Sequence, residues 1–104
     1  MAQTDPGIQA IAGLDRLVHE PARLMILAVL AAADSADFNF LLHQTGLTRG
    51  NLSSHLSRLE EAGYVDVTKE FVDKVPRTLL RLTEAGRTAF AAYRRDMLHV
   101  LGER

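Results

Sequence analysis

The stretch "LTRGNLSSHLSRLEEAGYV", residues 47–65, decides the fold, because it predicts one helix with two unlike faces. Its leucines recur at spacings of three and four residues, which predicts a helix face that packs into a core. These leucines are Leu52, Leu56 and Leu59. Thr48 suits the N-cap, because its hydroxyl accepts hydrogen bonds from first-turn amides, and Gly63 suits the stop. We therefore expect a helix over residues 47–62.

The opposite face of this helix has small, uncharged or basic side chains and no acidic residue before Glu60. Its members are Arg49, Gly50, Asn51, Ser53, Ser54, Ser57 and Arg58. Small side chains let a helix approach base edges in the DNA major groove, and the absence of acids avoids repulsion from phosphates. His55 lies beside the leucine stripe, so we interpret it as a packed histidine rather than a base contact.

The residues upstream predict three further helices, over residues 6–19, 21–33 and 38–46. A proline opens the second helix, where its missing N–H is harmless, and we expect Arg23 to form a structural ion pair in this helix. Asp37 suits the N-cap of the third helix, which a glycine ends. A short helix, a tight turn and a longer helix in this order predict a helix-turn-helix.

The period of the apolar pattern changes from 3.6 to 2 residues after the helix expected over residues 47–62. Strands are expected over residues 64–72 and 77–83, and a turn at residues 73–76 joins them into a hairpin. The residues expected to face inward are Val65, Val67, Phe71, Leu80 and Leu82. Basic residues gather near the tip, where a wing would reach the DNA backbone or minor groove: Lys69, Lys74 and Arg77.

A last, long helix is expected over residues 83–104, with Thr83 as its N-cap. The first and last helices carry more apolar surface than a chain of 104 residues can easily bury, so we expect them to pair two chains. The expected dimer interface consists of Ile8, Ile11, Leu14, Phe90, Tyr93, Met97, Val100 and Leu101. Residues 1–104 then form one domain, with dimerisation segments at 1–20 and 83–104.

The composition, with 47% hydrophobic residues and no cysteine, suits a globular protein and excludes disulfides, thiolate metal sites and cysteine nucleophiles. The net charge is only −1, but residues 38–59 contain two arginines and no acid, and residues 69–95 contain seven basic and three acidic residues. The chain lacks an apolar run of the ~20 residues that span a membrane, and its start lacks the pattern of a secretion signal. We therefore expect a cytoplasmic protein.

Three stretches of the chain resemble winged helix-turn-helix transcriptional regulators of the MarR/ArsR type. "LVHEPARLMILAVLA" is similar to their second helix, "GLTRGNLSSHLSRLEEAGYV" to their recognition helix, and "FVDKVPRTLLRLTEAGR" to their wing and the start of their last helix. The resemblance implies a mainly α fold with a β-hairpin wing (α+β). It also implies a homodimer that binds a pseudo-palindromic double-stranded DNA operator as a repressor. We expect no cofactor, because the sequence has no cofactor motif.

Carried over by position, the resemblance also implies which residues contact DNA. The helix contacts would be Thr48, Arg49, Gly50, Asn51, Ser53, Ser54, Ser57 and Arg58. The wing contacts would be Lys69, Lys74 and Arg77. The operator sequence, the regulated genes and an effector cannot be read from these residues.

Two alternatives compete with DNA binding. A winged helix that binds protein instead should have exposed apolar anchors on the outer face, which here has serine, asparagine and arginine. We expect no enzyme, because Ser54 and His55 are helix neighbours about 100° apart and no phosphate loop or nucleotide fingerprint is present. A zinc site would be compatible with DNA binding, since Asp96, His99 and Glu103 share a helix face, but their spacing matches zinc patterns poorly.

Overall fold

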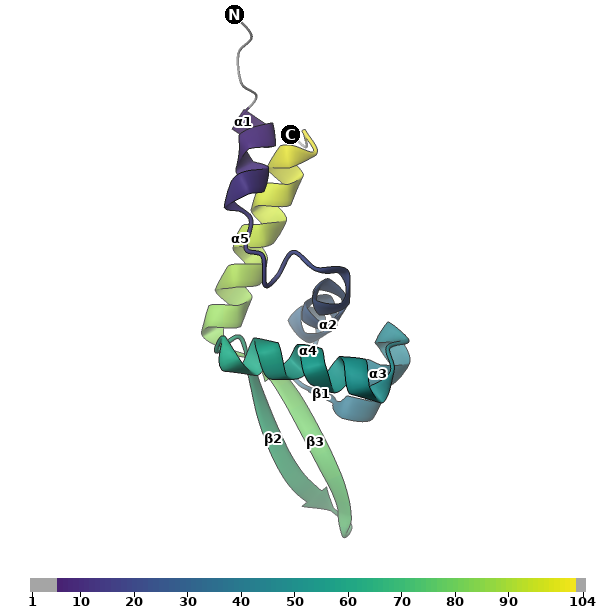
Figure 1. Ribbon diagram of the computed structural model, residues 1–104. Helices are drawn as coiled ribbons and strands as arrows, with labels where there is room; N and C mark the ends of the chain where they lie inside the picture. Colours follow the sequence, from purple (N-terminus) through teal and green to yellow (C-terminus); the bar gives the residue numbers. More distant parts are fainter. Residues whose placement is uncertain (1–5, 103–104) are drawn as a thin grey trace, which may run out of the picture.

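The computed structural model describes residues 6–102, which form an elongated molecule with extents of 67 × 25 × 24 Å (Figure 1). The helices are α1 (Pro6–Gln9), a 3-10 turn (Ala10–Gly13), α2 (Pro21–Ala32), α3 (Phe38–Thr45), α4 (Arg49–Glu61) and α5 (Glu84–Val100). The strands are β1 (Ala36–Asp37), β2 (Val65–Val72) and β3 (Val75–Leu82). The β2–β3 hairpin projects from one end of the molecule, and α1 lies beside the end of α5 at the other.

The predicted helix starts are confirmed, because short polar side chains cap them. The Asp37 carboxylate accepts from the amide of Phe40 at 2.7 Å, and the Thr48 hydroxyl accepts from the amide of Asn51 at 3.1 Å. Gly46 ends α3 in the left-handed region, with φ of 70°, which lets the chain turn sharply into α4. These local signals fix the helix-turn-helix formed by α3 and α4.

The sheet has three antiparallel strands in the order β1–β3–β2, of which the sequence predicted only the last two. The short strand β1 pairs Ala36 with Leu80 and lies between two predicted helices, where no strand was predicted. Strand β3 also begins two residues earlier than predicted. The hairpin turn is only two residues long, and both of them, Asp73 and Lys74, have positive φ of 51° and 67°.

The core lies where α2, α3 and α4 pack on the inner face of the sheet. Its fully buried side chains are Val18, Ile26, Leu27, Leu30, Leu41, Leu52, Leu59, Val65 and Leu80. Leu56 and Leu82 are also buried, so the predicted leucine stripe of α4 and the inward positions of β3 are confirmed. Among residues 6–102, no helix is long and apolar enough to cross a membrane.

Two sequence predictions about the ends of the fold are wrong. The first helix does not reach residue 19, because the Asp15 carboxylate accepts from the amides of Leu17 and Val18 and holds a turn there. Phe71 is not buried, although it lies on the same face of β2 as Val65 and Val67, because its place near the end of the hairpin lies beyond the core, and its residue is 76% exposed. Helix α5 has the predicted start, with Thr83 accepting from the amide of Gly86 at 2.9 Å.

Candidate nucleic-acid interface

The outer face of α4 is open, and every predicted contact residue on it is exposed. Gly50, Ser54 and Ser57 lie opposite the buried leucines, so the middle of this face has only small side chains until Glu61 at the end of the helix. Asn51 and Arg58 lie toward one edge of it. Within residues 6–102, the Arg58 side chain forms no hydrogen bond or ion pair, so its guanidinium is available to a ligand.

The Arg49 side chain lies toward α3 rather than along the middle of this face. Its Nη2 donates to Asn39 Oδ1 at 3.3 Å, and its guanidinium lies 5.8 Å from the centre of the Phe38 ring. Both partners belong to the first turn of α3, where Phe38 is half-buried and Asn39 is exposed. Arg49 therefore has a defined position at the junction of the two helices.

The predicted wing residues do not form one cluster. Lys69 and Lys74 are exposed on β2 and on the turn, whereas Arg77 Nη2 lies 3.3 Å from Asp37 Oδ2. A small hollow lies between the hairpin and the start of α4, and Arg49 and Arg77 line it from opposite sides together with Asp37. The structure therefore brings one predicted helix residue and one predicted wing residue to the same hollow.

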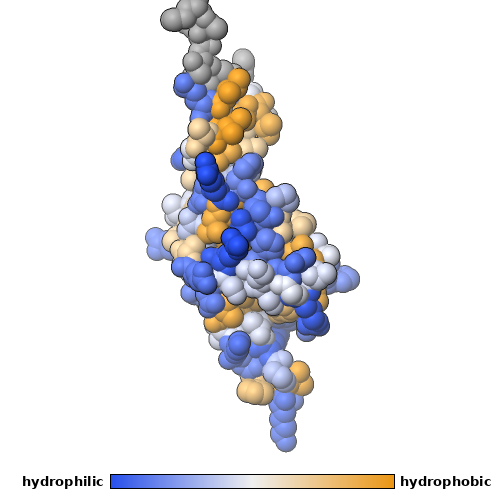
Figure 2. Space-filling model, in the orientation of Figure 1, coloured by the Kyte–Doolittle hydropathy of each residue, from blue (hydrophilic) through white to orange (hydrophobic). Residues whose placement is uncertain are grey.

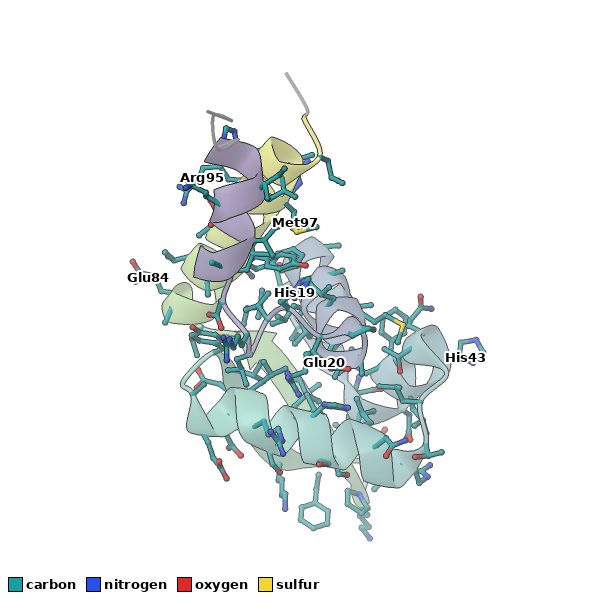
Figure 3. All side chains as sticks on the ribbon, turned by 45° about the horizontal axis from the view of Figure 1, so that its top comes forward. His19, Glu20, His43, Glu84, Arg95 and Met97 are labelled. Carbon is teal, nitrogen blue, oxygen red and sulfur yellow. The ribbon has the colours of Figure 1, made fainter. Side chains whose placement is uncertain are left out.

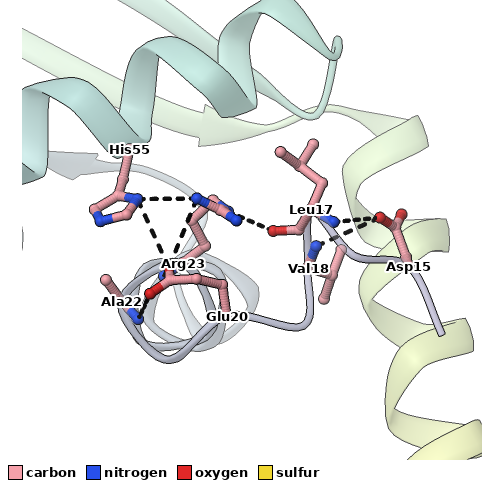
Figure 4. A network of polar contacts seen from close by, with 7 residues as sticks. All are labelled: Asp15, Leu17, Val18, Glu20, Ala22, Arg23 and His55. Carbon is pink, nitrogen blue, oxygen red and sulfur yellow. Dashed lines mark hydrogen bonds and ion pairs between the residues drawn. The ribbon is translucent and has the colours of Figure 1, made fainter. Parts of the chain in front are cut away.

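The inner face of α4 is held to α2 by a polar cluster of Glu20, Arg23 and His55 (Figure 4). Arg23 Nη1 lies 3.1 Å from His55 Nδ1 and 3.7 Å from Glu20 Oε2, and Arg23 Nε donates to the carbonyl of Leu17. A guanidinium can only donate, so His55 Nδ1 accepts. The expectations of a structural ion pair at Arg23 and a packed histidine are both confirmed.

Glu20 is the N-cap of α2, and its carboxylate accepts from the amides of Ala22 at 3.0 Å and Arg23 at 2.8 Å. Burial raises the pKa of Glu20, but these amide hydrogen bonds and the nearby guanidinium of Arg23 outweigh burial and lower the pKa below 4.5. Glu20 is therefore ionised under ordinary conditions and neutralises part of the charge of Arg23.

The segment before α2 has two tyrosine contacts that the sequence did not reveal. The Tyr64 hydroxyl donates to Asp15 Oδ2 at 2.6 Å, and the Tyr93 hydroxyl lies 2.7 Å from His19 Nδ1. The hydrogen bond to Asp15, followed by burial, raises the pKa of Tyr64. In Figure 3, His19 and Glu20 lie on this segment between α5 and α4. The segment therefore joins the recognition helix, the hairpin and α5.

The predicted dimer residues fall into three groups by exposure. Leu14 and Tyr93 are buried in the core of the single chain, where they offer little surface to a partner. Ile8, Ile11 and Leu101 are exposed by 61%, 50% and 71%. Phe90, Met97 and Val100 are half-buried.

The predicted zinc ligands are only partly described. Asp96 and His99 lie on α5, and Glu103 lies outside the described residues. In the part of the chain that the structure describes, no three histidine or acidic side chains are grouped to hold a metal ion.

The fold, with its helix-turn-helix and hairpin, can be compared with those of known proteins. The winged helix DNA-binding domain family matches residues 22–101. The chain belongs to this family. In this winged helix, α3 and α4 are the helix-turn-helix, and β2 and β3 are the wing.

Relatives of this winged helix include both curated proteins and solved structures. The uncharacterized protein MJ0432 of Methanocaldococcus jannaschii is 34% identical over 85 residues, 82% of this chain and 92% of that protein. The HTH-type transcriptional regulator YgaV of Escherichia coli is 29% identical over 70 residues, 67% of this chain and 71% of that protein. A transcriptional regulator homologue from Pyrococcus horikoshii OT3 has a TM-score of 0.84 and 28% identity over 92% of this chain and 94% of that chain.

The resemblance to winged helix-turn-helix regulators of the MarR/ArsR type is thereby confirmed. The chain is a winged-helix DNA-binding transcriptional regulator, and the family is not one of enzymes. The open, acid-free middle of α4 and the exposed lysines of the wing are the surfaces of this winged helix that suit DNA.

Proposed function

We propose that the chain is a dimeric repressor that inserts α4 into the major groove of a pseudo-palindromic operator and sets its wing on the flanking DNA. The observation that carries this proposal is the outer face of α4, where small side chains are exposed and flanked by Asn51 and Arg58. An α-helix fits the major groove, and a face that has no bulk or negative charge from Gly50 to Ser57 brings the helix close to the base edges.

Three side chains are proposed to read bases. Arginine binds guanine edges with two hydrogen bonds and asparagine does so with adenine, and each good pair contributes ~1–3 kcal/mol of discrimination. Arg58 and Asn51 are exposed for this purpose, and the defined position of Arg49 suits a fixed contact. Thr48, Ser53 and the wing residues Lys69, Lys74 and Arg77 are proposed to contact phosphates, which makes the affinity dependent on salt.

The dimer is proposed to form through α1 and α5, at the end of the molecule that lies away from the wing (Figure 1). The exposed apolar side chains there include Ile8, Ile11, Leu98 and Leu101, and Phe90, Met97 and Val100 are half-buried. A two-fold axis through this end of the molecule presents two copies of α4 to successive major grooves, ~34–36 Å apart. Occupation of a promoter by such a dimer would repress it.

Fluorescence anisotropy with a duplex from the DNA upstream of the chain's own gene, beside a scrambled duplex, tests DNA recognition at two salt concentrations. We expect tight, salt-sensitive binding with a clear preference for the first duplex. Arg58→Ala should weaken binding to that duplex more than to the scrambled one. Arg95→Ala is the matched control, because it removes the same charge from α5, where the side chain is 75% exposed and far from the wing (Figure 3).

Absence of binding to either duplex at low salt, by a folded chain, would refute DNA recognition and favour a winged helix that binds protein. Equal losses on both duplexes would make Arg58 a phosphate contact. Sedimentation equilibrium tests the dimer separately. Ile11→Glu and Leu101→Glu should each give monomers, and a wild-type chain that is already monomeric at micromolar concentration would refute the dimer.

A further inference from the structure

The end of the wing exposes more apolar surface than its own fold explains. Phe71, Val72 and Val75 are exposed by 76%, 40% and 60%, and none of them belongs to the core. Figure 2 shows apolar atoms beside hydrophilic ones near the end of the hairpin. An exposed phenylalanine on a two-stranded ribbon favours aggregation and adds little to folding, so its side chain is a candidate for a contact with another molecule.

The pairing of the strands fixes the face on which Phe71 lies. Side chains alternate along a strand, so Phe71 shares a face of β2 with Val65 and Val67, the face that packs against the helices. Helix α4 packs on this face, which places Phe71 on the recognition-helix side of the hairpin. Val72 and Val75, which are paired with each other, lie on the opposite face.

The neighbours of Phe71 on its own face carry positive charge and no acid. Phe71 pairs with Pro76, and the next pair along the same face is Lys69 with Thr78. Glu70 pairs with Arg77 on the other face, so the acidic residue of this strand points away. The outer face of α4, which has no acid before Glu60, and the Phe71 face of the wing therefore lie on the same side of the molecule, and the wing part is both apolar and basic.

We propose that Phe71, backed by Pro76, is an apolar wedge that contacts the minor groove beside the major-groove site of α4. The minor groove combines sugar walls, which are apolar, with rows of phosphates that suit Lys69 and Lys74. Apolar side chains that enter this groove partly unstack a base step and widen the groove. The wedge therefore favours flexible pyrimidine–purine steps in the flanking DNA, at positions that no side chain reads by hydrogen bonds.

A second copy of the chain is a less suitable partner for this tip. Two tips brought together would place Lys69 and Lys74 of both copies side by side, and like charges repel. DNA instead offers negative charge and apolar surface within one groove. The inference rests on the proposed function, because it needs a DNA duplex under α4, but it adds a contact residue and a distortion of the DNA.

The test uses the full chain and the upstream duplex, labelled with 2-aminopurine at successive steps outside the α4 site. Bound wild-type protein should raise the fluorescence at one flanking step, because unstacking relieves quenching. Phe71→Ala should lose this signal and bind about tenfold more weakly, the effect of losing one aromatic contact to bases. Phe71→Leu should retain most of both, since an aliphatic side chain can also act as a wedge.

Val75→Ala is the matched control, because Val75 is an exposed apolar residue of the same hairpin on the opposite face. It should bind and unstack as wild type does. An equal loss in Val75→Ala would overturn the assignment of the face, and an unchanged signal in Phe71→Ala would overturn the wedge while leaving DNA recognition intact. Failure of the wild type to bind any duplex would refute the proposed function itself. Circular dichroism melting of each variant separates these outcomes from unfolding.

Discussion

The Arg77 guanidinium of the wing lies 3.3 Å from the carboxylate of Asp37, the residue that caps α3. One carboxylate thus serves two purposes, since Oδ1 accepts from the amide of Phe40 while Oδ2 pairs with Arg77. The pair fixes Arg77 at the hollow that Arg49 lines from the other side. It also places a negative charge beside a surface that is proposed to meet phosphates, so Asp37 and the DNA compete for the same guanidinium.

Asp37→Asn separates the two purposes, because asparagine is as good an N-cap as aspartate but carries no charge. We expect the stability of the variant to stay close to that of wild type. Its affinity for both the upstream and the scrambled duplex should rise severalfold at low salt, with a steeper dependence on salt, because Arg77 becomes free to bind a phosphate. Anisotropy titrations at several salt concentrations measure both quantities.

Asp37→Ala is the control for this experiment, because it removes the ion pair and the cap together. Its free energy of unfolding should fall by about 1 kcal/mol relative to Asp37→Asn. Weaker DNA binding by Asp37→Asn would contradict the competition and would show instead that the ion pair positions Arg77 for its contact.

Two glycines in helices should respond in opposite ways to replacement by alanine. A Cβ at Gly86 would lie 2.1 Å from the carbonyl oxygen of Tyr64, which itself accepts from the amide of Thr83 at 3.0 Å. Backbone atoms cannot move aside as a side chain can, so Gly86→Ala should lower the free energy of unfolding by about 2–3 kcal/mol. Urea denaturation measures this loss.

Gly50→Ala is the counterpart, because nothing lies within 4 Å of a Cβ at this position on the outer face of α4. Alanine is the better helix former, so the variant should be more stable than wild type by up to about 1 kcal/mol. Its affinity for the preferred duplex should nevertheless fall, because the added methyl group separates α4 from the bases. A stabilised variant with unchanged affinity would contradict close approach at Gly50.

The parts of the fold that the sequence predicted well depend on contacts between near neighbours. Caps such as Asp37 and Thr48 act within one helical turn, and the spacing of the leucines alone predicts which face of α4 is buried. The exposure of Phe71 could not be predicted in the same way, because alternation gives the face of a strand but not how far the core extends beneath it. Strand β1 and the bonds of Tyr64 and Tyr93 join residues distant in sequence, and their residue types have many other uses.

In the candidate site, too, the sequence predicted local features but not contacts between residues distant in sequence. That the middle of α4 is open and free of acid follows from its own helical spacing, and the structure agrees. The partners of Arg49 and Arg77 lie on α3 and at its cap, ten or more residues away, so no local pattern reveals them. Sequence therefore predicted which residues surround the proposed DNA site, and the structure supplied which of them are already held by other side chains.

Stability should depend on pH through Glu20, whose pKa lies below 4.5 because amide hydrogen bonds from Arg23 and Ala22 outweigh the effect of burial. A carboxyl group whose pKa is lowered by folding stabilises the fold fully above its unfolded value, and this contribution is lost as the pH falls through the lowered pKa. Glu20→Gln should therefore be less stable than wild type near neutral pH. The difference in the free energy of unfolding should shrink below pH 4.5. Urea denaturation of both proteins at several pH values measures it, and a difference that stays constant would contradict the role of Glu20.

The turn of the wing provides a test that separates stability from DNA binding. Lys74 has φ of 67° in a two-residue turn, a conformation that favours glycine and costs other residues roughly 1–2 kcal/mol. Lys74→Gly relieves this strain, although glycine also increases the entropy of the unfolded chain, so we expect a net gain of about 0.5–1 kcal/mol in urea denaturation. Lys74→Ala keeps the strain and should show no such gain.

Both variants lose the same positive charge at the tip of the wing. They should therefore bind the preferred and the scrambled duplex more weakly by similar factors, and the slope of log affinity against log salt should flatten by about one phosphate contact. A more stable but weaker-binding Lys74→Gly would mean that the turn keeps lysine in a strained conformation because its charge is needed at the DNA. Unchanged affinity in both variants would contradict that explanation, because the strained lysine would then not strengthen DNA binding.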